Sequence, residues 1–375
     1  MAWISGVGMV RINRHYQKGL RDLAVEAASQ ALRDAGVDGI DYVVVASSSS
    51  YRQVGQLDLA SYTSSYLGLR GARSLAVEAG EASGLAGLLT AYSLVASGAA
   101  ETVLLVGVDK LTEYNSGEAY DMIEGLYDVE GEGFYNIGHA GVAGLLMRLY
   151  MHEYGVDRLT MSYWPAVMHA NAKQNPYAML RFAVTPEKVA SAMPLADPVT
   201  LLDSYPLGDG AAAVVVTRRP GQVRIVGVET ATGLPSPAHR DDPLYLESVA
   251  EAVSRLGLSR EDLEGIDVME IHDSFTITAY MILETLGLSD KGRAAKDLAE
   301  GKYTVEGDGP VMNPSGGLKA RGHPIGATGV YQLAEVTMYL RGDFPGVKTN
   351  GARRGMVISM NAMGSSAYTA LLQAE

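Results

Sequence analysis

A short glycine pattern occurs twice in this chain and constrains its fold more than any other feature. The octets Gly80–Gly87 and Gly322–Gly329 both have glycine at their first, fifth and eighth positions. The residue after the first glycine is Glu81 in one octet and His323 in the other, so these two side chains occupy equivalent positions. Internal repetition predicts two similar halves, and equivalent residues of such halves meet near the axis that relates them.

Longer segments repeat in the same order. Residues 20–36 carry leucine and alanine at helical spacing and are followed by a β-branched run that begins at Asp38. Residues 244–257 are followed in the same way by a run that begins at Glu264. Two further predicted strands also have counterparts, 103–108 with 356–361 and 208–216 with 364–372. Helices that alternate with apolar strands are typical of α/β proteins.

The two halves differ in length because the first contains an insert. We predict a first half at 1–219, with the insert at about 110–205, and a second half at 220–375. The insert is too long for a plain loop of a compact domain. It is predicted to form a small, mainly helical cap with helices near 140–153 and 186–192. Its cations Lys173 and Arg181 are either ligand contacts or ordinary solvated surface charges.

The composition excludes several classes of function. Thirty basic and 43 acidic residues give a net charge of −13, which disfavours binding to nucleic acid or to an anionic membrane. No apolar run approaches the roughly 20 residues of a membrane helix, so a soluble, cytoplasmic protein is expected. The chain has no cysteine, and hence no thiol nucleophile. Its remaining histidines show no metal-ligand spacing; structural or surface roles, and no metal, are expected for His15, His139, His152 and His239.

Both octets lead into helices of small residues, predicted at 86–96 and 327–340. A polar side chain at a helix N-terminus lies beside unpaired backbone N–H groups, where negative charge is stabilised. Glycine-rich helix starts can also serve packing alone. Two octets in register, each with an ionisable residue at the same position, favour a site at the centre of the molecule containing Glu81 and His323.

These motifs resemble those of the thiolase superfamily over essentially the whole chain. Residues 313–329 resemble the signature around the catalytic histidine, and residues 77–84 resemble the nucleophile segment, with Glu81 in place of the cysteine. His272–Phe275 resembles the His-Asp-Cys-Phe box of the sterol-carrier-protein type, with Ser274 in place of the cysteine, and the archaeal branch fits best. The resemblance implies an α/β thiolase fold, five-layered αβαβα, built from two repeated βαβαβαββ halves with the insert over the active site.

The resemblance also implies roles for individual residues. His323 and His272 would bind a thioester oxygen, while the backbone N–H groups of Glu81 and Gly364 would form a second oxyanion site. The insert would contact coenzyme A. His169, Ser274 and Asn313 are weaker candidates for a substrate or CoA loop. Ala362 stands where many thiolases carry a second cysteine, so every thiol role is vacant.

Ligands and partners follow from the same resemblance. CoA or acyl-CoA is expected as ligand, with no tightly bound cofactor. The family implies a homodimer or homotetramer. It also implies possible assembly with a small zinc-ribbon and oligonucleotide-fold (OB-fold) protein, a hydroxymethylglutaryl-CoA synthase or a thiolase paralogue.

A carboxylate is a weak nucleophile toward a thioester and would form a reactive anhydride, so ordinary thiolase chemistry is not expected. This disfavours an active acetyl-CoA C-acetyltransferase with a non-cysteine route. Three hypotheses remain open. The chain is a CoA-ester-binding or partner subunit of a thiolase-type complex, or a cysteine-independent decarboxylase or retro-aldolase that uses Glu81 and His323, or a protein whose former site Glu81 merely fills.

Overall fold

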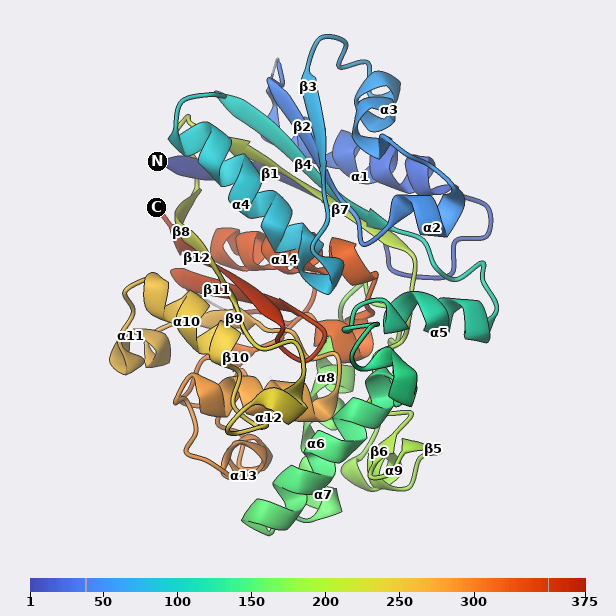
Figure 1. The fold of residues 1–375 in the computed structure, drawn as a ribbon. Coiled ribbons are helices and arrows are strands. Elements are labelled where there is room, and N and C mark those ends of the chain that lie inside the picture. Colours follow the sequence, from blue (N-terminus) through green and yellow to red (C-terminus); the bar gives the residue numbers. More distant parts are fainter. Residues whose placement is uncertain (38, 350) are drawn as a thin grey trace.

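The computed structural model describes residues 1–37, 39–349 and 351–375, and Figure 1 shows their arrangement. The first half runs through β1 (Ala2–Met9), α1 (Leu20–Ala35), β2 (Tyr42–Ala46), α3 (Leu59–Tyr66), β3 (Arg73–Val77), α4 (Ser83–Ala96), β4 (Thr102–Asp109) and β7 (Gly210–Thr217). The second runs through β8 (Val223–Thr232), α10 (Glu247–Arg255), β9 (Val268–Glu270), α12 (Thr276–Thr285), β10 (Val311–Met312), α14 (Thr328–Arg341), β11 (Arg354–Asn361) and β12 (Ser366–Ala374). Each half therefore follows the predicted βαβαβαββ order.

The strands of the two halves are arranged in the same way. The first half has the order β1-β7-β4-β2-β3, and the second has the equivalent order β8-β12-β11-β9-β10. In each half the two inner pairs are antiparallel and the two outer pairs are parallel. A short antiparallel pairing of β1 with β8 joins the halves into one hydrogen-bonded order of ten strands.

Alternate strand residues face different helical layers. Val43 and Val45 of β2 pack in the cluster that contains α1, whereas Val44 between them packs with α4 and α14. In β11, Val357 faces the layer of α4 and α14, while its neighbours Met356 and Ile358 pack with α10 and α12. Successive side chains of a strand point to opposite faces. The five-layered αβαβα prediction is confirmed, with α4 and α14 in the central layer (Figure 1).

The two central helices approach each other closely where both octets have glycine. A methyl group added at Gly84 would lie 2.7 Å from the nitrogen of Val330 and 2.9 Å from Cα of Gly329. Small residues at these positions therefore set the spacing of α4 and α14, as the sequence predicts.

Replacing Gly84 with alanine is expected to lower the free energy of unfolding by about 1 to 3 kcal/mol, because the added methyl group must push two backbones apart. Denaturant unfolding followed by circular dichroism measures the loss. Gly39→Ala is the matched control, since nothing lies within 4 Å of a methyl group at that exposed position. Equal stabilities for the two variants would contradict the close packing.

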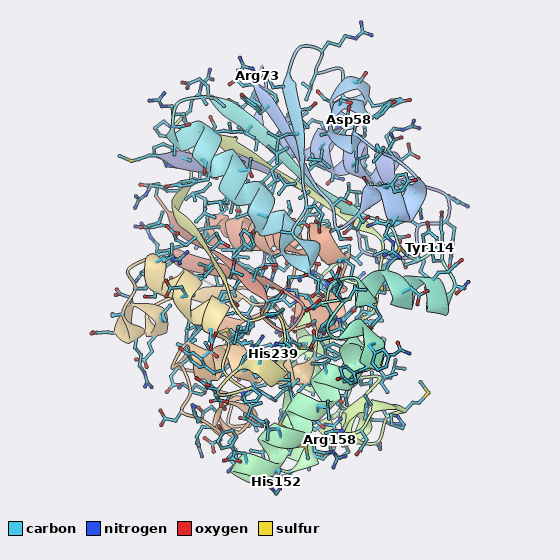
Figure 2. All side chains as sticks on the ribbon, viewed as in Figure 1. Asp58, Arg73, Tyr114, His152, Arg158 and His239 are labelled. Atoms are coloured by element: carbon cyan, nitrogen blue, oxygen red, sulfur yellow. The ribbon has the colours of Figure 1, made fainter. Side chains whose placement is uncertain are left out.

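The insert lies between β4 and β7 and is mainly helical. Its elements are α5 (Ser116–Glu124), a 3-10 turn (Gly133–Tyr135), α6 (His139–Tyr154), α7 (Arg158–Met161), α8 (Tyr163–Ala172), α9 (Pro186–Ala190), β5 (Pro194–Ala196) and β6 (Val199–Thr200). Two of them, α6 and α9, are the helices predicted from the sequence. The insert packs on the second half through the cluster that contains α12. Figure 2 shows its residues His152 and Arg158 at the end of the molecule opposite Arg73 of β3.

Some predicted boundaries differ from the structure. The run that begins at Glu264 does not extend as one strand, because Glu264 ends the short helix α11 (Arg260–Glu264) and β9 begins only at Val268. Position 38, where the matching first run begins, lies outside the described residues. Among the helices that the structure describes, none has the length and apolar character needed to cross a membrane.

Candidate functional site

The ends of three segments place the central side chains. Glu81 lies in the 3-10 turn Gly80–Ala82 that leads into α4, and His323 precedes the turn Ile325–Ala327 that leads into α14. His272 follows β9. Gly80 has a φ of +58°, and a Cβ atom there would lie 2.0 Å from Oδ1 of Asn361. Only glycine fits this turn, so the first glycine of the octet fixes where Glu81 projects.

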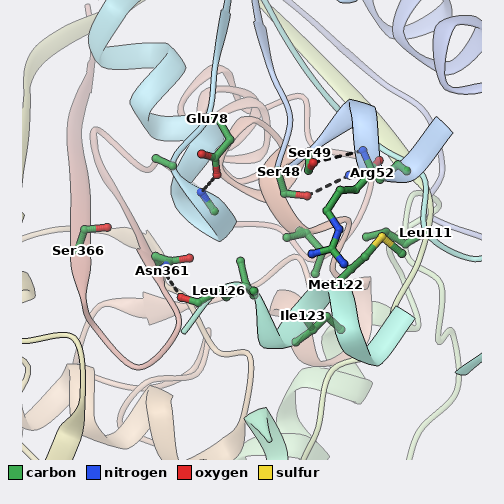
Figure 3. A pocket seen from close by; sticks show the side chains of 15 residues that line it. Ser48, Ser49, Arg52, Glu78, Leu111, Met122, Ile123, Leu126, Asn361 and Ser366 are labelled. Carbon is green, nitrogen blue, oxygen red and sulfur yellow. Dashed lines mark hydrogen bonds between the residues drawn. The ribbon is translucent and has the colours of Figure 1, made fainter. Parts of the chain in front are cut away.

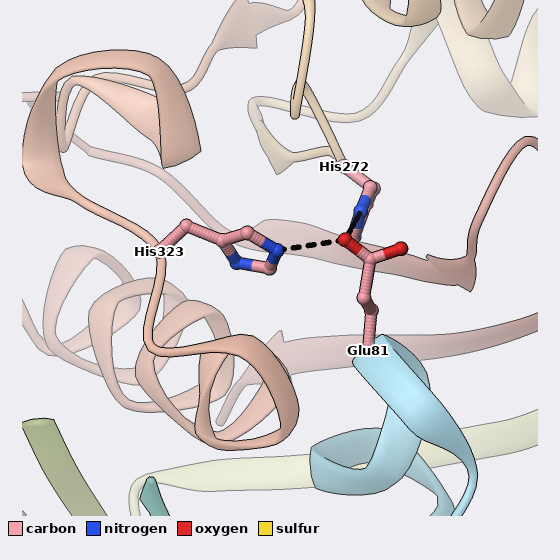
Figure 4. A group of neighbouring side chains, drawn as sticks. All are labelled: Glu81, His272 and His323. Atoms are coloured by element: carbon pink, nitrogen blue, oxygen red, sulfur yellow. Dashed lines mark hydrogen bonds and ion pairs between the residues drawn. The ribbon is translucent and has the colours of Figure 1, made fainter. Parts of the chain in front are cut away.

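Glu81, His323 and His272 meet in the interior, and all three are fully buried (Figure 4). Oε1 of Glu81 lies 2.9 Å from Nε2 of His323 and 3.7 Å from Nε2 of His272. Its other oxygen, Oε2, accepts a hydrogen bond of 2.7 Å from the backbone N–H of Ala362. The structure thus brings together the two repeat-equivalent residues and His272, which the resemblance had placed beside His323. One carboxylate oxygen lies between two imidazoles.

A third histidine, for which the sequence predicted a structural or surface role, borders this cluster. His139, the first residue of α6, is buried against Phe275, with ring centroids 4.8 Å apart. The hydroxyl of Tyr205 lies 3.3 Å from its Nδ1, and the Tyr205 ring also contacts the edge of His323. The insert has no counterpart in the second half, so the repeat could not reveal His139 or Tyr205.

The electrostatics favour a carboxylate at Glu81. Burial alone would raise its pKa, but the neighbouring His139, His272 and His323 hold the pKa of Glu81 well below its usual value. Burial lowers the pKa of His323 to about 4 and also lowers that of His139, so both are neutral near pH 7. Hydrogen bonds from His323 and from the backbone N–H of Ala362 stabilise the ionised Glu81 even when His139 and His323 are neutral.

Several buried polar atoms around the carboxylate have no hydrogen-bond partner among the described residues. They include both ring nitrogens of His272, Nε2 of His139, Oη of Tyr127 and Oγ of Ser274. An unsatisfied buried polar group costs about 1 to 3 kcal/mol, and such groups are uncommon in folded proteins. Their concentration here indicates a site built to contact something polar.

The other predicted site residues have different environments. The N–H of Gly364 donates to the carbonyl of Asn361, and the N–H of Glu81 donates to Oδ1 of the same residue. A ligand oxygen would have to replace Asn361 at both donors. Asn313 bonds through its side chain to the backbone of Ile271 and so fixes the segment that carries His272.

The candidates from the insert lie apart from the cluster. Nδ1 of His169 lies 2.9 Å from the carbonyl of Phe182, and no contact of its side chain with Glu81 or His323 is seen. Lys173 and Arg181 are exposed, as expected of surface charges.

A cavity of about 510 Å³ lies beside the cluster (Figure 3). Its wall includes Gly80 and Asn361, which flank Glu81, together with Met122 and Leu126 of the insert. Glu81, His272 and His323 are not among its lining residues. The cavity therefore reaches the backbone next to Glu81, but the Glu81 carboxylate does not line it.

The fold and the site together define a twice-repeated αβαβα protein with a polar centre at the heads of its two central helices. The family models "Thiolase, N-terminal domain" and "Thiolase C-terminal domain-like" match residues 9–193 and 243–374. The acetyl-CoA acetyltransferase of Methanocaldococcus jannaschii is 35% identical over 353 residues, which cover 91% of this chain and 90% of that protein. This chain belongs to the thiolase family.

Other relatives agree with this assignment. Sterol carrier protein 2 of Gallus gallus is 27% identical over 394 residues, which cover 98% of this chain and 71% of that protein. Among solved structures, the Ltp2-ChsH2(DUF35) aldolase superposes with a TM-score of 0.83 at 21% identity, covering 100% of this chain and 97% of that one. At that identity the match shows the shared fold alone.

Proposed function

We propose that this protein binds acyl-CoA without thiolytic activity, as a CoA-ester-binding or partner subunit of a thiolase-type complex. One observation carries the proposal: Oε1 of Glu81 lies between Nε2 of His323 and Nε2 of His272. These are the imidazoles that the family resemblance assigns to a thioester oxygen. The residue at the nucleophile position thus fills the place of the acyl oxygen with a carboxylate oxygen.

The composition supports the same conclusion. Thiolysis needs a group that attacks a thioester and later leaves, and the chain has no cysteine to provide one. Glu81 is held on both oxygens, by His323 and by the N–H of Ala362, so its carboxylate is not free to attack. The proposed site is therefore a pseudo-active site for thiolysis within a CoA-ester-binding fold.

A second candidate function is cysteine-independent carbon–carbon bond chemistry on an acyl-CoA, such as decarboxylation or a retro-aldol reaction. The Glu81–His323 hydrogen bond supports it, because it joins a proton acceptor to a proton donor in a buried site. The Ltp2-ChsH2(DUF35) aldolase has the same fold, and its name is consistent with carbon–carbon bond chemistry on this fold.

The partners proposed for this protein follow its family. We propose a cytoplasmic homodimer or homotetramer that takes part in lipid metabolism. Assembly with a small zinc-ribbon and OB-fold protein, a hydroxymethylglutaryl-CoA synthase or a cysteine-bearing thiolase paralogue is part of the same proposal. The DUF35 component in the name of the aldolase neighbour is consistent with a small partner.

One experiment tests both candidates. The pure protein is incubated with CoA plus acetoacetyl-CoA, and separately with malonyl, β-keto and β-hydroxy acyl-CoAs, and the products are followed by mass spectrometry. We expect acyl-CoA binding by calorimetry and no CoA-dependent cleavage of acetoacetyl-CoA. Measurable thiolysis would refute the first proposal.

The Glu81→Gln variant separates the two functions. Turnover of a decarboxylation or retro-aldol substrate that Glu81→Gln abolishes supports the second candidate. Full retention of that turnover by the variant shows that Glu81 is not the proton acceptor. Binding of CoA esters with no turnover on the whole panel leaves the binding or partner role as the function.

A further inference from the structure

We propose that Glu81, His272 and His323 form a binding site for one divalent transition-metal ion such as Zn²⁺. The three side chains come from three distant segments, so no ligand spacing along the chain reveals them, and no metal was expected from the sequence. The inference concerns the same residues as the proposed function but does not rest on it, since metal content is measurable without any CoA ester.

The ligand atoms are close enough to share an ion. One ligand atom from each of Glu81, His272 and His323 lies within 4.8 Å of the other two. Zinc binds imidazole nitrogen at about 2.0–2.1 Å and carboxylate oxygen at about 2.0–2.2 Å, which separates two tetrahedral ligands by roughly 3.4 Å. The distances from Oε1 to the two nitrogens, 2.9 and 3.7 Å, bracket that value.

The surrounding contacts leave these atoms available. Nδ1 of His323 lies 2.6 Å from Oγ1 of Thr328, and Oε2 of Glu81 is held by the Ala362 N–H. Partners on the far side of a ligand orient it and fix its tautomer. When Nδ1–H of His323 donates to Thr328, its Nε2 lone pair faces the ion. Metal binding thus moves the proton from Nε2 to Nδ1 and releases none.

His272 provides an independent reason. It is fully buried, and neither of its ring nitrogens has a hydrogen-bond partner among the described residues. Figure 4 shows its ring pointing at the Glu81 carboxylate. At 3.7 Å the two groups are too far apart for a hydrogen bond, but an ion between them would satisfy both. A bond to a metal ion would therefore offset the cost of burying the His272 ring, which no hydrogen bond among the described residues offsets.

The donor set selects the kind of ion. Two imidazoles and one carboxylate suit zinc and other first-row divalent ions, whereas Mg²⁺ and Ca²⁺ prefer oxygen ligands. Three protein ligands are the number found in catalytic zinc sites, where the fourth position holds water or substrate. His139 borders the cluster, and its Nε2 has no partner among the described residues.

The test is a titration of chelator-treated protein with Co²⁺, followed by displacement with Zn²⁺. We expect one Co²⁺ per chain, visible absorption bands of a four- or five-coordinate ion, and loss of those bands when Zn²⁺ is added. A spectrum that stays that of aqueous Co²⁺ overturns the proposal. Mg²⁺ is expected to leave the Co²⁺ spectrum unchanged, and displacement by Mg²⁺ would contradict the assigned donor set.

Variants locate the ion. Glu81→Gln, His272→Ala and His323→Ala are each expected to weaken Co²⁺ binding by about 100-fold or more. His152→Gln is the control for surface binding, since His152 lies in the last turn of α6, at the opposite end of that helix from His139. His169→Gln is the control for loss of a buried histidine.

A second readout guards against variants that merely misfold. Zn²⁺ is expected to raise the melting temperature of the wild type and of both control variants, and to leave that of Glu81→Gln unchanged. Glu81→Gln keeps the shape of the side chain, so its circular dichroism spectrum shows whether the fold is intact. Wild-type Co²⁺ affinity in a folded Glu81→Gln or His272→Ala protein would refute the site.

Discussion

Replacing Asp209 with alanine lowers the free energy of unfolding by about 3 to 5 kcal/mol, the cost of leaving a buried charge without its partner. Asp209 is fully buried and accepts a hydrogen bond of 3.0 Å from Nζ of the buried Lys110. It also accepts hydrogen bonds from the backbone N–H groups of His15, Leu111 and Thr112. One carboxylate therefore holds the loop after β1 and the first residues of the insert against the start of β7.

Equilibrium unfolding in urea measures this loss. Asp157→Ala is the matched control, because Asp157 accepts from the N–H and the hydroxyl of Thr160 at an exposed helix start. Losing such a cap costs about 1 kcal/mol. A loss at Asp209 no larger than at Asp157 would show that the buried contacts contribute little.

The contribution of Asp209 depends on pH in a defined direction. Burial alone would raise its pKa, but the donors from His15, Thr112 and Lys110 lower the pKa of Asp209 below its usual value. A depressed carboxyl pKa stabilises the fold above the unfolded-state value of about 3.9, and the stabilisation disappears as the pH falls through the folded pKa. The difference between wild type and Asp209→Ala is thus present at neutral pH and shrinks below about pH 4.

Arg321→Met is expected to destabilise the protein by a similar amount, about 3 to 5 kcal/mol. Arg321 lies two residues before His323, is fully buried and is paired with the buried Glu335 of α14. Glu270, which accepts a hydrogen bond from Ser315, is a second acid nearby, and burial together with Glu335 raises its pKa well above the usual value. Without the guanidinium, Glu335 remains a carboxyl group in an apolar interior beside another acid.

A double variant tests the cause of this loss. In Arg321→Met with Glu335→Leu, both members of the buried ion pair are removed, and hydrophobic replacement of a whole buried pair is often nearly neutral. We expect urea unfolding to show the double variant to be more stable than Arg321→Met alone. If the double variant is the less stable of the two, the pair is not the reason for the loss.

Sequence reasoning predicted the parts of the molecule that are repeated. The glycine octets identified the helix starts and paired Glu81 with His323 because both features occur twice at one spacing. The β-branched runs such as Val43–Val45 predicted buried strands, whose alternate residues face different helices, whereas the five layers were implied by the family resemblance. Strand ends were less predictable, since Glu264 has a helical environment although its neighbours fit a strand pattern.

The rest of the site is not repeated in the sequence, so internal repetition could not predict it. His139 and Tyr205 belong to the insert, which has no equivalent in the second half. Ala362 contributes only its backbone N–H, and a backbone donor cannot be recognised from the residue type at that position. The grouping of His272 with Glu81 depends on where β9 ends relative to α4, a distance that spacing along the chain does not encode.

The pairing of β1 has a consequence for synthesis on the ribosome. Its neighbours in the sheet are β7 and β8, so Trp3 has no strand partner until Thr217 and Arg224 have been translated. A nascent chain that has just completed the insert still has two open strands, β1 and β4, awaiting β7. Exposed strand edges readily pair with other chains. Ribosomal pausing inside the insert would therefore favour aggregation, whereas after β7 has been translated the five strands of the first half can all pair with one another.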